Sequence, residues 1–184
     1  MTATTERPSL PAPAKLARVL FDEAHSEAWT IRPEVAARMQ SVHPGDSSLV
    51  RAAAVLAERE LEVAAHTEGP LDAETLADAA VLVIAHPSDP KWEETVNGGS
   101  PLLAPAEIDA IEAFVRDGGG LIVLGETEED KYGANLNELL GRFDLSIDNA
   151  TLQDYVHHLH DAPSRTDFLR LPGRIAPWNV EFGR

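Results

Sequence analysis

The stretch Val81-Leu-Val-Ile-Ala85 is a continuous apolar run between two polar segments. A strand that is apolar on both faces belongs in the middle of a parallel sheet covered by helices on both sides. A second such run, Leu121-Ile-Val-Leu124, comes directly after Gly118-Gly119-Gly120. These glycines permit positive φ angles and so end the preceding helix. The two runs predict the centre of a parallel sheet.

Helices and strands are expected to alternate on either side of these runs. Further strands are predicted at Arg18–Phe21 and Leu61–Ala65, and Phe143–Ile147 is a candidate fifth strand. One helix is expected to follow an N-cap at Asp46 or Ser47 and to bury Leu49, Ala53, Leu56 and Ala57. The other expected helices are Pro33–Met39, Asp72–Ala79, Ala106–Asp117 and about Asn135–Arg142. This strict alternation predicts an α/β fold, namely a three-layer, flavodoxin-like sandwich with a mainly parallel central sheet.

The composition divides the chain into one domain with two irregular ends. Residues 1–15 are polar and proline-containing without an apolar segment, so a disordered leader is expected rather than a signal peptide. Residues 16–150 carry the α/β pattern. Residues 151–184 form an irregular C-terminal tail with proline and glycine breaks. Two interpretations of this tail stay open: the domain is incomplete, or it packs against another chain.

Charge and cysteine content exclude several function classes. The chain has a formal net charge of −16 and no cysteine, which rules out disulfides, thiolate metal sites and cysteine nucleophiles. An acidic surface repels nucleic acid and anionic membranes. No apolar run reaches the ~18 residues of a membrane span. A cytoplasmic protein is expected that binds neither nucleic acid nor membrane, and a homo-oligomer stays open.

Polar and titratable residues collect where the predicted strands end. Sites in open parallel sheets form at the carboxyl ends of the strands, and the residues there are Asp22 and His25, His86, and Glu126. We expect these four to share a pocket, with His25, His86 and Glu126 as candidate catalytic groups. Further ligand contacts are expected from Asp22, Glu23, Trp29, Ser88 and Thr127. The plainer alternative is that these residues are polar only because they lie in loops.

Metal binding is expected at neither of the two histidine groups. The strand-end histidines are too far apart in sequence to form a local metal motif, and no cofactor is predicted. In the tail, His157 and His160 are three residues apart and flanked by Asp154 and Asp161. That spacing suits two ligands on one helix face, but a solvated surface stretch is the favoured interpretation.

Four segments carry a family resemblance. They are Val19-Leu-Phe-Asp-Glu-Ala-His25, the long loop into Leu49–Ala57, Ala80-Val-Leu-Val-Ile-Ala-His86, and Ala110-Ile-Glu-Ala-Phe-Val-Arg-Asp-Gly-Gly-Gly-Leu-Ile-Val-Leu-Gly125. Over about Arg18–Ile147 the chain resembles the class I glutamine amidotransferase-like superfamily, and within it the ThuA-like, trehalose-utilisation type of domain. That family places a nucleophilic cysteine just after the strand that corresponds to Leu121–Leu124, where this chain has Gly125-Glu126-Thr127. The resemblance therefore implies a branch without thiolate glutaminase chemistry.

Three functions remain open at this stage. The favoured one is a non-catalytic domain that binds a small molecule or a partner protein through the strand-end residues. The alternative is a hydrolase acting on a sugar or another small substrate, with His25 or His86 as base, Glu126 as acid or electrostatic stabiliser, and Asp22 orienting a histidine. A weaker alternative is a metal-dependent protein that uses His157 and His160.

Overall fold

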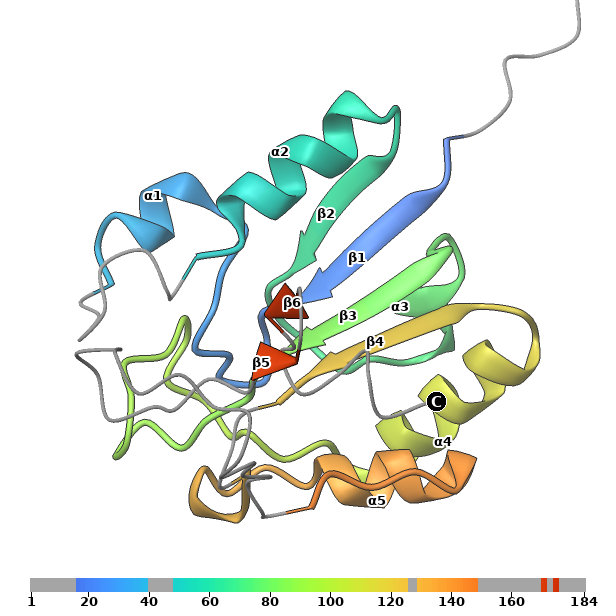
Figure 1. The fold of residues 1–184 in the computed structure, drawn as a ribbon. Coiled ribbons are helices and arrows are strands. Elements are labelled where there is room, and N and C mark those ends of the chain that lie inside the picture. The colour runs from blue at the N-terminus through green and yellow to red at the C-terminus, as the bar shows by residue number, and fades with distance from the viewer. Residues whose placement is uncertain (1–15, 40–47, 126–128, 149–169, 172–173, 176–184) are drawn as a thin grey trace, which may run out of the picture. The chain divides into compact units, whose positions relative to one another are not determined.

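The computed structural model describes residues 16–39, 48–125, 129–148, 170–171 and 174–175 (Figure 1). The chain divides into two compact units, Met1–Ile147 and Asp148–Arg184. The first unit contains a parallel sheet of four strands, β1 (Arg18–Asp22), β2 (Glu62–His66), β3 (Val81–Ala85) and β4 (Gly120–Leu124), in the spatial order β2-β1-β3-β4. In the second unit, β5 (Arg170–Leu171) pairs with β6 (Arg174–Ile175) in the antiparallel direction.

Helices cover both faces of the parallel sheet, which confirms the predicted α/β sandwich (Figure 1). On one face, Val19, Phe21 and Val83 pack against Leu56 of α2 (Val50–Glu58) and against Leu49, which precedes this helix. The other face packs against α3 (Ala73–Leu76), α4 (Pro105–Arg116) and α5 (Leu136–Leu140); its buried core is Leu20, Leu71, Leu76, Leu82, Ile84, Leu103, Ile108, Ile111, Leu136 and Leu139. Each fully buried leucine or isoleucine stabilises the fold by ~1.5–3 kcal/mol.

The predicted N-cap of α2 at Asp46 or Ser47 is wrong, because the helix begins later, at Val50 with Leu49 as its N-cap. Thr30 and Ser48 form an isolated parallel bridge, and the Leu49 amide donates to the Thr30 carbonyl. These contacts place Ser48 in a bridge to Thr30 and not in the helix. Asp46 and Ser47 themselves lie outside the described residues.

The predicted fifth strand at Phe143–Ile147 is also wrong. Phe143 ends the short 3-10 helix η2 (Gly141–Phe143), and Asp144 follows with a φ of 60° in the left-handed region. Ile147 donates its amide to Asn137 Oδ1 and accepts from Asn137 Nδ2. The side chain of Asn137 therefore takes the place that a neighbouring strand would occupy.

The sheet order places a topological switch point between β1 and β3. These two strands are neighbours, but β1 continues through α2 on one face, while β3 continues through α4 on the other. Ligands in open α/β sheets bind at the carboxyl ends of strands at such a point. Among the described residues, no helix has the length and apolar character to cross a membrane.

Candidate functional site

The loop after β1 buries a pair formed by a carboxylate and an imidazole. Asp22 ends β1, and its Oδ2 atom lies 2.8 Å from His25 Nδ1. The other oxygen, Asp22 Oδ1, accepts from the Ala24 amide at 3.1 Å. The loop then turns at Ser26, which has a φ of 63° although it is not glycine. A non-glycine residue in this region stores backbone strain, which is concentrated at functional sites.

Glu107 reaches the same histidine from α4. His25 Nε2 lies 3.0 Å from Glu107 Oε1, so both ring nitrogens face carboxylates. Burial lowers the pKa of His25, but the hydrogen bond and charge of Asp22, together with Glu107, outweigh it and raise this pKa above its ordinary value. Glu107 is itself fixed, since it accepts from the amides of Leu71 at 2.9 Å and Ala104 at 2.7 Å.

Glu27 adds a third carboxyl group to this cluster. It is fully buried, and its Oε2 accepts from the His25 amide at 3.0 Å. Oε1 has no hydrogen-bond partner among the described residues. Burial, and then the charge and hydrogen bond of Asp22, raise the pKa of Glu27 to about 10. Glu27 therefore carries a proton at neutral pH, because two adjacent buried carboxyl groups cannot both be ionised without a cation between them.

His86 occupies the corresponding position after β3. It is fully buried and has a φ of 58°. Its Nε2 lies 2.8 Å from Glu93 Oε2, whereas its Nδ1 is buried with no partner in the described part of the chain. The rings of Trp29 and Tyr132 lie 5.3 Å and 4.6 Å from the imidazole, centroid to centroid. The imidazole is thus walled by aromatic rings and oriented by one carboxylate.

Backbone hydrogen bonds join the two loops. The Ala28 amide donates to the His86 carbonyl, and the Ser88 amide donates to the Ser26 carbonyl, each at 3.0 Å. The Ser26 hydroxyl donates to the Ser88 carbonyl at 2.9 Å. Ser88 Oγ is buried and has no partner among the described atoms. The switch point therefore holds three buried polar atoms that have no partner in the part of the chain that the structure describes: Glu27 Oε1, His86 Nδ1 and Ser88 Oγ.

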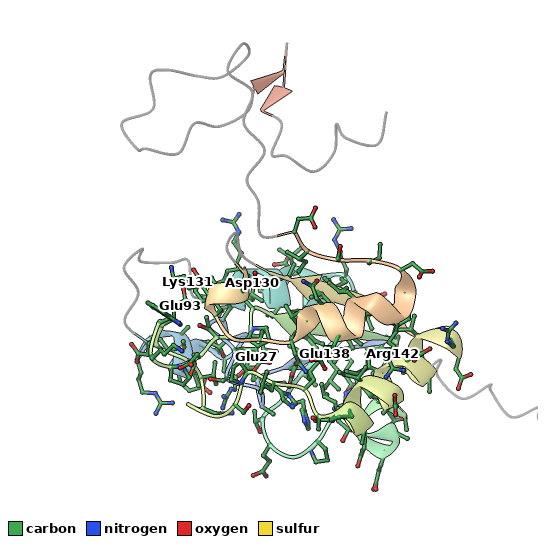
Figure 2. The ribbon with its side chains drawn as sticks, turned by 90° about the horizontal axis from the view of Figure 1, so that it is seen from below. Glu27, Glu93, Asp130, Lys131, Glu138 and Arg142 are labelled. Carbon is green, nitrogen blue, oxygen red and sulfur yellow. The ribbon has the colours of Figure 1, made fainter. Side chains whose placement is uncertain are left out.

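The segment after His86 folds over the loop that follows β1. Thr95 Oγ1 accepts from the Ser26 hydroxyl at 3.0 Å, and the Val96 amide donates to the Glu27 carbonyl at 2.9 Å. Asn97 Nδ2 donates to the carbonyls of Glu23 and Thr67. In Figure 2, Glu27 lies within the body of the unit, while Glu93 lies toward its side. Lys131 Nζ is 5.5 Å from the Trp92 ring of this segment.

Glu23 stabilises the local backbone and does not join the carboxylates around His25. Its buried Oε1 accepts from the Thr30 hydroxyl at 2.8 Å and the Ile31 amide at 2.7 Å. Its Oε2 accepts from Arg32 Nε at 2.6 Å. Both oxygens are therefore occupied in holding the turn before α1 (Pro33–Ala36).

The structure brings several of the expected site residues together. Asp22 is in contact with His25. Backbone bonds of Ser26 and Ala28, in the same loop, link it to Ser88 and His86, and Trp29 lies against His86. Glu126 and Thr127, and the tail histidines His157 and His160, lie outside the described residues.

Sequence reasoning missed Glu107, Glu27 and Glu93 as members of the site. Glu107 lies on a helix, where no site residue was expected, although its position after Pro105 marks it as a residue that bonds back to the helix N-terminus. Glu93 lies in a long loop whose path no sequence pattern reveals.

Comparison with known proteins adds little about this site. The chain matches no protein-family model, and it matches no curated protein. Among solved structures it is similar to the mmIFT52 N-terminal domain, with 17% sequence identity and a TM-score of 0.48. The similarity covers 69% of this chain and 44% of that one, so this chain matches less than half of the other's length.

Proposed function

We propose that this chain binds a small polar molecule where β1 and β3 end, with His86 and Ser88 as direct contacts. The observation that carries the proposal is a pair of buried atoms, His86 Nδ1 and Ser88 Oγ, for which residues 16–39, 48–125 and 129–148 provide no hydrogen-bond partner. A buried polar atom without a partner costs ~1–3 kcal/mol, so natural proteins retain few of them without a reason. A ligand hydroxyl or carbonyl would supply the missing hydrogen bonds.

The surroundings of His86 support the same proposal. Two non-glycine residues at this junction, Ser26 and His86, have φ angles in the left-handed region. Trp29 and Tyr132 flank the imidazole, as aromatic side chains commonly do in small-molecule sites. We also propose that the chain belongs to a cysteine-free, ThuA-like branch of the glutamine amidotransferase-like superfamily. Binding of a small molecule agrees with that resemblance.

A screen of melting temperature tests the binding function. Sugars and nucleotides are added to the full chain with a chelator present, because a ligand of the native state raises its melting temperature. Ser88→Ala removes a hydroxyl that bonds to none of the described residues, so the variant should fold as well as the wild type but lose the shift. Ser100→Ala, an exposed serine of the same loop, is the matched control. The proposal fails if no probe stabilises the wild type, or if Ser88→Ala responds as the wild type does.

A hydrolase is the second candidate, because Glu93 lies 2.8 Å from His86 Nε2. A carboxylate that orients an imidazole leaves the other nitrogen to act as a base. His86 suits this role better than His25, whose two nitrogens already face Asp22 and Glu107. Turnover of nitrophenyl esters or glycosides should fall about 100-fold in Glu93→Gln, and remain unchanged in the exposed control Glu74→Gln. Equal rates in the two variants would exclude the mechanism.

A further inference from the structure

Three side chains at the end of β1 and in the loop that follows it lie close enough together to hold a metal ion. Asp22, His25 and Glu27 are all buried, and one ligand atom from each lies within 4.8 Å of the other two. We propose that this trio, Asp22-x-x-His25-x-Glu27, binds a divalent transition-metal cation of the Zn²⁺ or Mn²⁺ class. The site is distinct from the contacts proposed for His86 and Ser88, although it adjoins them.

The remaining polar atoms of the trio are fixed by the surrounding protein. Asp22 Oδ1 accepts from the Ala24 amide, and Glu27 Oε2 accepts from the His25 amide. On the imidazole, Nε2 faces the Glu107 carboxylate at 3.0 Å. Each side chain is therefore held by one atom. Glu27 Oε1 has no partner among the described residues, whereas Asp22 Oδ2 and His25 Nδ1 contact each other at 2.8 Å and would exchange that contact for the cation. Outer contacts of this kind, above all a carboxylate behind a histidine, are typical of metal ligands.

A second observation points independently to a cation. Glu27 Oε1 is fully buried and has no partner among the described residues, although it belongs to a strongly polar cluster. Asp22 and Glu27 also bring two carboxyl groups together in the interior. Such a pair requires a positive charge or a shared proton between its members. A divalent cation would meet both needs at once.

The donor set selects the class of cation. Two carboxylate oxygens and one imidazole nitrogen suit Zn²⁺ and Mn²⁺, whereas Ca²⁺ and Mg²⁺ prefer oxygen alone and Cu⁺ prefers sulfur. On binding, the cation would displace the proton from Nδ1 of His25 and the proton from Glu27. Three protein ligands leave at least one coordination position for water or a small ligand, as in catalytic zinc sites.

Metal titration of the full chain tests the inference. Chelator-treated protein is titrated with Zn²⁺ by calorimetry and with Mn²⁺ by electron paramagnetic resonance, in which the signal of free Mn²⁺ falls on binding. We expect one ion per chain. Affinity should fall at least about tenfold in Asp22→Asn and in Glu27→Gln, which keep side-chain size. Glu74→Gln, an exposed residue of α3, should bind as the wild type does.

Two outcomes would overturn the cation site. One is the absence of stoichiometric binding of either ion to folded wild type, and the other is equal affinity in Glu27→Gln and wild type. Circular dichroism of each variant separates loss of the site from loss of the fold. Ser88→Ala should bind the cation as the wild type does. A failed sugar and nucleotide screen would therefore leave the cation site intact, and a failed metal titration would leave the proposed small-molecule site intact.

Discussion

Glu107 Oε1 lies 3.0 Å from His25 Nε2 and also accepts from the Leu71 amide, so one carboxylate joins the loop after β1 to α4 and to the segment before α3. Its other oxygen holds the amide of Ala104 at the start of α4.

Replacing this carboxylate should cost stability. In Glu107→Gln, the amide nitrogen cannot accept a hydrogen bond, so one buried N–H group loses its partner. We expect the free energy of unfolding to fall by about 1–3 kcal/mol in urea denaturation. Glu112→Gln breaks only the exposed ion pairs with Arg116 and Arg142 and should cost no more than about 1 kcal/mol. Similar losses in both variants would contradict the structural role of Glu107.

Glu23 is expected to stabilise the fold rather than bind a ligand. Glu23→Ala leaves the Thr30 hydroxyl, the Ile31 amide and Arg32 without their shared acceptor. The expected loss is about 3–5 kcal/mol, as for other broken buried ion pairs. Glu62→Ala removes the partner of Arg18 at a half-exposed position and serves as control, with an expected loss of at most about 1 kcal/mol. Denaturant titration of both variants measures the difference.

Gly119 allows Phe114 to pack closely against the turn after α4. A Cβ atom at Gly119 would overlap the Phe114 ring, which lies on the core. Gly119→Ala should therefore lower stability by about 1–3 kcal/mol. At Gly141 an added Cβ would meet open space, and φ is −59°. Gly141→Ala should be neutral or stabilising by up to about 1 kcal/mol. Thermal melts that rank the two variants in the opposite order would contradict this packing.

The metal-free protein should lose stability as the pH rises. Glu27 has a folded pKa of about 10 beside Asp22, against an ordinary value of 4.5, so between these values the folded state holds a proton that the unfolded state releases. Stability therefore falls with increasing pH by at most about 1.4 kcal/mol per unit. His25, whose pKa is also raised, adds a loss in the same direction above its ordinary value of 6.5.

Glu27→Gln isolates the contribution of this carboxyl group. The variant cannot ionise, so its unfolding free energy should depend less on pH between pH 5 and 9 than that of the wild type. Denaturation in a chelator across about five pH values measures the two slopes. Equal slopes would show that Glu27 is not the group that binds the extra proton.

The sheet could be predicted from the sequence because its strands are short apolar runs, which can be identified from the local sequence without knowledge of tertiary contacts. Val81–Ala85 is a strand with the predicted bounds, β1 and β4 each differ by one residue at one end, and β2 is shifted by one residue at both ends. The strand predicted at Phe143–Ile147 is wrong because a short apolar segment suits a strand and an irregular segment equally well. Its conformation depends on Asp144 and on the distant side chain of Asn137.

The site could be predicted only in part. The loop residues Asp22, His25 and His86 follow strands whose carboxyl ends share one edge, and topology brings them there. Glu107 could not be found in this way, because a helix residue far along the chain reaches His25 only through tertiary packing.

The parallel arrangement of β1 and β3 determines when the cluster around His25 can form. During translation β1, Asp22 and His25 leave the ribosome well before β3 and α4, so these polar groups stay hydrated in the nascent chain. Their burial must wait until α4 delivers Glu107 and closes that side of the sheet. Desolvation of the cluster is thus expected late in folding, as for other contacts between distant parts of a chain.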